Sequence, residues 1–229
     1  MLDSLKNDRA FDLNADIGDG FEGENSAHDE RVIKRLTSAN IACGFHGGDP
    51  AVMKRSVDFA LKYKVAIGAH LGLPNVMGLA LNPGKVSAKK AYAQVLYQLG
   101  ALNAFVVAQD AQIQHVKLQG ALYEMSRSDR ELSDAIVDAV VRFDKKLIVL
   151  GPAQSELLFA AQDAGLNAAV ELPITSVDEL SEDSSLGSGY ASLSVDAAEP
   201  YAVQLLDEIR RDMHKKGLKL APLRDLHLG

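Results

Sequence analysis

Two carboxylates and an amide alternate in the segment FDLNADIGDG, which begins at residue 11. Asp12, Asn14 and Asp16 are spaced two residues apart, so on a β-strand their side chains all point to one face. Burying two carboxylates is costly unless they are paired, bind a ligand or share a proton. We therefore expect this face to take part in catalysis. The alternative is a hydrogen-bonded polar plug inside a barrel.

A second group of reactive side chains follows in the segment ANIACGFHGGDP. Asn40 and Gly44 share one face of a predicted strand, and the same spacing continues to His46. The glycines around His46 allow a backbone to approach a ligand closely. Asp49 precedes a proline, which is typical of a helix N-cap. We expect His46 to be functional and Asp49 to cap a helix at the same rim.

Two later segments repeat this arrangement of a small-residue strand that ends in polar side chains. VAIGAHLG places His70 at the end of a predicted strand, and QHVKLQG alternates His115, Lys117 and Gln119. A lysine that points inward is costly unless it is paired, and Asp12 or Asp16 is the expected partner. Two roles remain open for Lys117: a structural ion pair, or a cation that binds a carboxylate or stabilises an oxyanion.

A divalent metal is a further hypothesis for these residues, with Asp16, His46 and His70 as its ligands. No HxH or HxxxH pair makes such a site specific, so we do not expect a metal. The sequence also contains no phosphate-binding P-loop and no GxSxG elbow. These absences argue against nucleotide binding by a P-loop and against a serine hydrolase of the GxSxG type.

The elements that must position these residues alternate between short apolar runs and amphipathic stretches. We predict β-strands at 10–14, 39–43, 65–69, 113–117, 147–151, 167–171 and 191–195. Helical stripes lie between them, at Val95, Leu99, Leu102 and Val106 and again at Ala202, Leu205, Ile209 and Met213. Ser128 and Glu131 predict a capping box. This alternation predicts a parallel sheet, closed or doubly wound, whose ligands bind at the C-terminal ends of the strands.

Length and composition favour one α/β domain that spans residues 1–229. The net charge of −7, from 24 basic and 31 acidic residues, argues against a nucleic-acid or membrane surface. The first ten residues lack the apolar core of a signal peptide, so we expect a cytoplasmic protein. The single cysteine, Cys43, is interpreted as a small buried residue. Residues 173–190 are predicted to form a mobile loop.

Several segments closely resemble the LamB/YcsF family, the A-type subunits of 5-oxoprolinase: DLNADIGDG, TSANIACGFHGGDPAVM, VAIGAHLGLP, VLYQLGAL and HVKLQGALYEMS. The resemblance implies a seven-stranded α/β barrel similar to the glycoside hydrolase/deacetylase barrels, and so favours a barrel over an open sheet. It also implies ATP-dependent opening of 5-oxoproline to glutamate, together with partner subunits B and C and with ATP as cosubstrate. The family motifs have the same residues at Asp12, Asn14, Asp16, His46, Asp49, His70 and Lys117.

Other positions depart from the family pattern. Leu118 and Gln119 replace the usual Pro-His, residues 78–82 lack two arginines, and Asp196 stands where a histidine is usual. A stretch before the last strand is also missing. These changes remove cations and imidazoles that would bind an anionic substrate, so we expect altered or reduced activity. The residues expected to contact substrate are Asn40, Gly44, Asp49, Gln119 and Asp196.

The leading hypothesis is a hydrolase subunit that acts on a cyclic amide. In it Asp12 or Asp16, with Asn14 beside them, provides the general base, while His46 and His70 transfer protons or orient the carbonyl. Lys117 holds a carboxylate or stabilises the oxyanion. Two alternatives are a metal-dependent, deacetylase-like hydrolase and a non-catalytic binding or scaffold subunit.

Overall fold

The computed structural model describes residues 10–20, 26–74, 86–176 and 191–226. The departure at residues 78–82 lies outside these ranges, as does most of the predicted loop at 173–190. Pro173, the first residue of that predicted loop, is the last residue of a strand.

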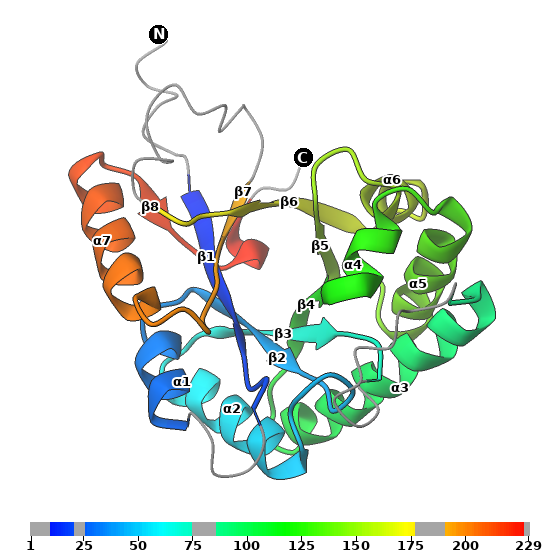
Figure 1. The fold of residues 1–229 in the computed structure, drawn as a ribbon, viewed down its shortest axis with the longest axis horizontal. Helices are drawn as coiled ribbons and strands as arrows, with labels where there is room; N and C mark the ends of the chain where they lie inside the picture. Colours follow the sequence, from blue (N-terminus) through cyan, green and yellow to red (C-terminus); the bar gives the residue numbers. More distant parts are fainter. Residues whose placement is uncertain (1–9, 21–25, 75–85, 177–190, 227–229) are drawn as a thin grey trace, which may run out of the picture.

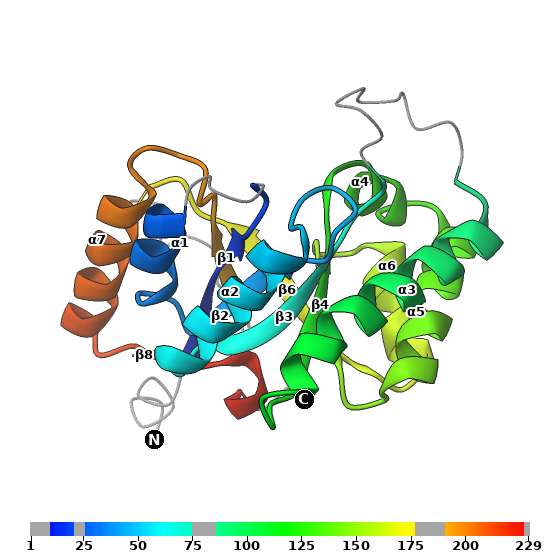
Figure 2. The ribbon, with the colours of Figure 1, turned by 90° about the horizontal axis from the view of Figure 1, so that it is seen from below.

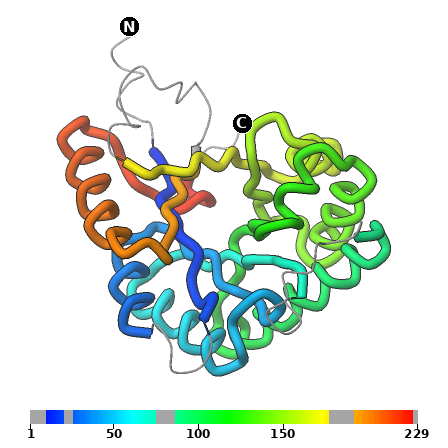
Figure 3. Tube along the Cα trace, in the orientation of Figure 1, coloured from blue at the N-terminus to red at the C-terminus, as the bar shows by residue number. Residues whose placement is uncertain are grey.

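Seven parallel strands form a closed barrel (Figure 1). They pair in the order β2-β3-β4-β5-β6-β7-β1, and β1 also pairs with β2, which closes the ring. All seven predicted strands are confirmed, with boundaries shifted by up to three residues, and Figure 3 shows the path of the chain around the barrel. The strands are β1 (Ala10–Ile17), β2 (Ser38–Ala42), β3 (Ala66–Leu71), β4 (Ile113–Leu118), β5 (Ile148–Gly151), β6 (Asn167–Pro173) and β7 (Ala191–Val195).

Helices cover the outside of the barrel (Figure 1). Both predicted helical stripes are confirmed: all four residues of each stripe are buried, in α3 and α7 respectively. None of the helices in the described part of the chain is both long and apolar enough to cross a membrane. The helices are α1 (Ser26–Ile33), α2 (Pro50–Lys62), α3 (Ala88–Val107), α4 (Gly120–Ser126), α5 (Arg130–Phe143), α6 (Glu156–Asp163) and α7 (Ala202–Lys215).

The predicted helix caps have different outcomes. Asp49 caps α2 as predicted, because its carboxylate accepts hydrogen bonds from the backbone N–H groups of Ala51 and Val52. The predicted capping box of α5 is wrong. Asp129 is the N-cap and accepts from Leu132 N, whereas the backbone N–H of Ser128 donates to Met125 O in the turn that ends α4. The helix therefore begins one residue later than the box requires.

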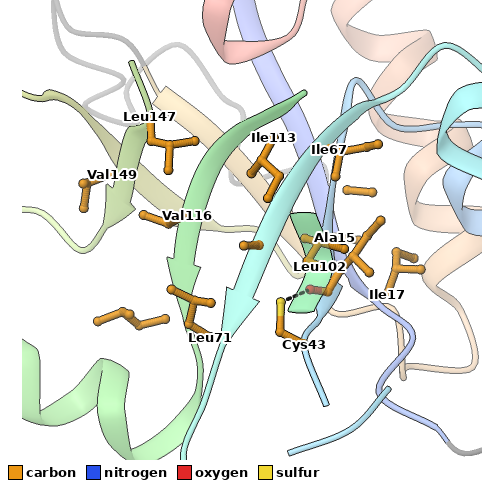
Figure 4. Packing of buried hydrophobic residues seen from close by; sticks show 14 of the residues in the cluster. Ala15, Ile17, Cys43, Ile67, Leu71, Leu102, Ile113, Val116, Leu147 and Val149 are labelled. Atoms are coloured by element: carbon orange, nitrogen blue, oxygen red, sulfur yellow. Dashed lines mark hydrogen bonds between the residues drawn. The ribbon is translucent and has the colours of Figure 1, made fainter. Parts of the chain in front are cut away.

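The main core lies between the barrel and the helices, and Figure 4 shows part of it. Alternate strand residues such as Leu13, Ala15 and Ile41 point outward into this layer and are fully buried. Cys43 lies in the same layer, and its thiol donates to Ile41 O at 3.2 Å. Burial raises the pKa of the Cys43 thiol well above its usual range. This confirms the interpretation of Cys43 as a small buried residue.

A second, smaller apolar cluster lies inside the barrel, against the inward faces of β5 and β6. It consists of Ile148, Leu150 and Ala169 together with Leu223 and Leu226 from the C-terminal segment. That segment contains β8 (Lys219–Leu220), which pairs with the start of β1, and the 3₁₀ turn η4 (Leu223–Asp225). Figure 2 shows η4 at the end of the barrel opposite α4. The C-terminal segment therefore packs into the N-terminal end of the barrel, which leaves the polar strand ends at the other end as the place to look for a site.

Candidate active site

Asp12 lies deep in the barrel and is completely buried. Its two oxygens accept hydrogen bonds from Thr37, Ser38, Ser192 and Asn14. Burial raises the pKa of the Asp12 carboxyl, although these four donors act in the opposite direction. Asp12 therefore has the surroundings of the hydrogen-bonded plug, and it lies away from the rim where a substrate would enter.

Asn40 connects the deep polar residues to the upper level of the barrel. Its Nδ2 donates to Asn14 Oδ1 at 2.7 Å and to Asp16 Oδ1 at 2.8 Å. Because a carboxylate oxygen such as that of Asp16 only accepts, these contacts fix which end of the amide is nitrogen. Asn40 Oδ1 must then accept from His115 Nε2, 2.7 Å away. Asn40 thus orients Asp16, Asn14 in turn accepts from Asn40, and a direct role of either amide in catalysis or substrate binding stays a prediction.

His115 is an interior residue that stays neutral. It is completely buried, and burial together with the charge of Lys117 lowers the pKa of His115 to about 3. The ring occupies space that only a glycine leaves open, because a Cβ on Gly68 would lie 2.0 Å from His115 Nε2. Gly68 and His115 are paired residues on β3 and β4. Gly68 on β3 therefore leaves the space that the His115 ring of the neighbouring strand β4 occupies.

Lys117 joins three strands through its ammonium group. Nζ lies 2.8 Å from Asp16 Oδ1, 2.8 Å from Glu171 Oε1 and 3.2 Å from Ser194 Oγ. Burial lowers the pKa of Lys117, but the two carboxylates outweigh it and raise the pKa above its usual value. Because an ammonium has three N–H donors and all three have acceptors here, Lys117 has none left for a substrate. Of the two partners predicted for Lys117, the structure selects Asp16.

Asp16 is the carboxylate that reaches the open end of the barrel. Its side chain is 30% exposed, whereas that of Lys117 is only 8% exposed. Burial raises the pKa of the Asp16 carboxyl, but His70 and Lys117 outweigh burial and hold the pKa below its usual range. Oδ1 is held by Lys117 and Asn40, while Oδ2 faces His70 Nε2 at 3.6 Å. Asp16 is thus an ionised, oriented carboxylate.

Two imidazoles and a third aspartate meet beside Asp16 at the rim. The rings of His46 and His70 lie edge to face, with centroids 4.7 Å apart. Asp19 Oδ1 lies 3.3 Å from His46 Nε2 and 3.7 Å from His70 Nδ1. Burial raises the pKa of the Asp19 carboxyl, but the two histidines outweigh burial and lower it below its usual range. The cluster is formed by the segments that follow β1 and β2 and by the end of β3.

The remaining predicted residues lie at the same end of the barrel or near it. Gly44 turns the chain after β2 with a positive φ of 90°, and Asp49 caps the helix that follows. Gln119 is the N-cap residue of α4, and its backbone N–H donates to Leu71 O. Asp196 is exposed after β7 and accepts from Ala198 N. Their contact with a substrate remains a prediction.

Two residues that the sequence analysis did not single out are central to the site. Glu171 is a buried acid in a predicted apolar strand and occupies an inward position two residues after Ala169. An acid at an inward position could have indicated a site residue, but its partner Lys117 could not be identified without the strand register. Asp19 lies two residues beyond the strand that carries Asp16, between two glycines. A turn residue of this kind has no periodicity to reveal its direction.

The geometry provides the parts needed for hydrolysis of a carbonyl compound. Asp16 is an ionised carboxylate that can accept a proton from water, and the two imidazoles beside it can stabilise charge at a reacting oxygen. A hollow of about 1090 Å³ lies elsewhere, over α7 and β8, and is lined by residues such as Tyr201, Arg210 and Leu220. None of the predicted site residues lines it, so the rim of the barrel is the candidate active site.

The chain is similar in sequence to a known family of proteins. The model of the LamB/YcsF family matches residues 11–175. The A subunit of 5-oxoprolinase from Bacillus licheniformis is 47% identical over 161 residues, which cover 70% of this chain but only 64% of that protein. The A subunit of 5-oxoprolinase from Pyrococcus abyssi is 33% identical in an alignment 249 positions long, which covers 93% of this chain and 98% of that protein.

A solved structure extends the likeness to three dimensions. The lactam utilization protein from Thermus thermophilus superposes with a TM-score of 0.81 at 29% identity, covering 93% of this chain and all of that chain. The homocysteine methyltransferase MmuM of Escherichia coli, at 10% identity and a TM-score of 0.53, shares the fold alone. This chain therefore shares its barrel fold with the lactam utilization protein.

Proposed function

The chain belongs to the LamB/YcsF family, and we propose that it is a hydrolase subunit that opens the lactam ring of 5-oxoproline to glutamate. The relatives named as the A subunit of 5-oxoprolinase and the lactam utilization protein support this substrate class. Because their name is that of one subunit, we propose that B- and C-type subunits complete the enzyme and that ATP is the cosubstrate of the assembly. The absence of a P-loop motif from this sequence is consistent with ATP binding to a partner subunit.

The observation that carries this proposal is the oriented Asp16 carboxylate beside His70 at the open rim. Hydrolysis of a lactam adds water across the carbonyl–nitrogen bond. One group must accept a proton from the attacking water, and another must stabilise the negative charge that develops on the carbonyl oxygen. We assign proton acceptance to Asp16 and charge stabilisation to the group that contains His46 and His70.

Of the two roles that the sequence left open for Lys117, this proposal assigns the ion pair. Its three donors are engaged by Asp16, Glu171 and Ser194, so it positions Asp16 and keeps that carboxylate ionised. The carboxylate of the substrate would then need another cation. The expected arginines at 78–82 are absent from the sequence, which supports weaker binding of 5-oxoproline than in relatives that have them.

The test is reconstitution of the chain with its own partner subunits, followed by measurement of ATP-dependent release of glutamate from 5-oxoproline. Asp16→Asn should lower kcat by roughly 10²- to 10⁴-fold, because removal of a general base has effects of that size. Asp134→Asn is the matched control, since this aspartate is exposed on α5 and pairs with Arg130, away from the rim.

The melting temperature of each variant identifies loss of activity that results from unfolding. If Asp16→Asn keeps the kcat of the unmodified chain, the assignment of the base is wrong. If the complete assembly releases no glutamate, the proposed function is wrong, and the alternative of a non-catalytic subunit is favoured.

A further inference from the structure

The cluster at the rim has the dimensions of a metal site. Asp19, His46 and His70 each offer one donor atom, and these atoms lie within 4.8 Å of one another. Asp19 Oδ1 lies 3.3 Å from His46 Nε2 and 3.7 Å from His70 Nδ1. Donors bound to one tetrahedral zinc ion at about 2.1 Å would lie about 3.4 Å apart. The three side chains are therefore already close to a coordinating arrangement.

The two imidazoles are buried and make no well-aligned hydrogen bond to a described residue, although Asp19 Oδ1 lies 3.3 Å from His46 Nε2. The side chains of His70 and His46 are 1% and 8% exposed. Within the described part of the chain, all four of their ring nitrogens lack a hydrogen-bond partner. A buried polar atom without a partner costs about 1 to 3 kcal/mol, so such atoms usually face a ligand or an ordered water. Two adjacent rings in this state point to a ligand that lies between them.

Two glycines allow the three ligand segments to approach one another. A Cβ on Gly72 would lie 2.4 Å from His46 Nδ1, and a Cβ on Gly47 would lie 2.3 Å from the carbonyl oxygen of Asp19. Any other residue at these positions would force the His46 and Asp19 segments apart. The close approach is thus specific to this part of the rim and holds the donors together.

We propose that Asp19, His46 and His70 bind one divalent transition-metal ion, with zinc as the best match to the donor set. Imidazole nitrogens suit zinc and its neighbours in the first transition series, whereas magnesium and calcium require oxygen ligands. Three protein ligands leave one tetrahedral position open, as in catalytic zinc sites. The sequence hypothesis had Asp16 as the third ligand, whereas the structure groups Asp19 with the two histidines.

Asp16 is an outer partner of this site, which means that it does not bind the ion but faces His70, one of the proposed ligands. His70 faces Asp19 through Nδ1 and Asp16 through Nε2, so a metal on Nδ1 leaves the proton on Nε2 to be donated to Asp16. Carboxylates in this position orient a ligating histidine and increase its basicity. Lys117, bound to the other oxygen of Asp16, fixes the carboxylate in turn. The deep polar network of the barrel therefore supports the cluster at its rim.

A bound ion would supply a Lewis acid at the place where the lactam carbonyl reacts. That role rests on the proposed function, whereas binding of the ion does not. The two can therefore be tested separately, by binding of zinc and by release of glutamate.

The experiment is titration of Zn²⁺ into the full chain after treatment with a chelator, by isothermal calorimetry and by elemental analysis after dialysis. We expect one tightly held ion per chain, a visible absorption band when Co²⁺ replaces Zn²⁺, and no saturable binding of Mg²⁺. His46→Ala and Asp19→Asn should lose the ion. His214→Ala is the matched control, because this histidine is exposed on α7, away from the cluster.

Asp16→Asn should weaken Zn²⁺ binding by roughly 10- to 100-fold without abolishing it, which is the behaviour of an outer partner. Asp19→Asn keeps its size at a half-exposed position, so it tests the site even if His46→Ala does not fold. The proposal is overturned if the unmodified chain binds no stoichiometric ion, or if Asp19→Asn binds as tightly as the unmodified chain. Stoichiometric binding without glutamate release would leave the metal site intact and refute the proposed function.

Discussion

Lys117 illustrates how the chemistry of a single residue depends on its partners. An inward lysine could bind a substrate, but an ammonium that donates to Asp16, Glu171 and Ser194 has no donor to offer. The sequence predicted the pairing with Asp16 because both side chains lie on inward positions of their strands. It did not predict Glu171, because the alternation along one strand does not show that β4 and β6 both pair with β5. The alternation of residue types along a strand therefore shows on which face a side chain lies, whereas its interaction partners depend on the register between strands.

Replacement of Lys117 by methionine tests this network. Lys117→Met leaves the Asp16 and Glu171 carboxylates near each other without their cation, so we expect a loss of about 3 to 5 kcal/mol in the free energy of unfolding. The double variant Lys117→Met with Glu171→Leu should recover part of that loss, because one buried charge is removed. Urea unfolding at pH 7 measures both. A loss below about 1 kcal/mol in the single variant would show that the pair is solvated.

His115 predicts a pH dependence of stability. Its pKa is about 3 in the folded chain and about 6.5 when unfolded, so below pH 6.5 the unfolded state binds the extra proton. Its contribution to stability is therefore complete above pH 6.5 and is lost as the pH falls toward 3. Between pH 7 and pH 5 the loss from this residue is about 2 kcal/mol.

The comparison that isolates this contribution is His115→Gln, which has no titrating ring. Urea unfolding of both proteins at pH 7 and pH 5 should show that the unmodified chain loses about 2 kcal/mol more than the variant. Equal losses in the two proteins would mean that the buried imidazole does not govern stability in acid.

At the scale of elements, the strands were predictable because short apolar runs alternate with amphipathic stretches, and because interior positions of β1, β2 and β3 are small or polar while Ile148 and Leu150 of β5 are the apolar exceptions inside the barrel. The same alternation placed Asp16, His70 and Lys117 on inward faces. Two features had no such pattern. Asp19 lies in a turn beyond its strand, and its contact with His46, which the continued strand spacing did predict, depends on close approaches at glycines. The cap of α5 was wrong because Ser128 is held by the preceding turn, which a local motif does not show.

The contact between β3 and β4 gives a prediction at this scale. Gly68→Ala would place a methyl group 2.0 Å from His115 Nε2, so the ring must move and its hydrogen bond to Asn40 must lengthen. We expect a loss of at least about 2 kcal/mol in the free energy of unfolding, from overpacking. Thermal and urea unfolding provide the measurement.

Gly100→Ala is the matched control for that substitution. Gly100 lies inside α3, and a Cβ there has no neighbour within 4 Å among the described residues. Alanine is the better helix former, so this variant should gain roughly 0.5 to 1 kcal/mol. Opposite signs for the two glycine-to-alanine changes are the expected result. A neutral Gly68→Ala would show that β3 and β4 can separate without cost.

At the scale of the whole molecule, the barrel has two different ends. One end is open and carries the polar cluster, and the other is closed by the C-terminal segment. Arg35, just after α1, forms two hydrogen bonds with Asp207 on α7 and so joins the first and last helices. The sequence predicted seven strands and the helical stripe of α7. It could not predict β8 and η4, because two or three residues are too few to show periodicity.

Leu223 tests whether this closing segment contributes to stability independently of the site. Its side chain is completely buried against Ile148, Leu150 and Ala169, so Leu223→Ala leaves a cavity and should cost about 2 to 5 kcal/mol. Phe159→Ala is the control, because Phe159 is 44% exposed on α6 and should cost much less. Zn²⁺ titration of the folded Leu223→Ala chain should match that of the unmodified chain, since the cluster lies at the other end. Weaker ion binding in this variant would mean that closure of one end of the barrel determines the geometry of the other.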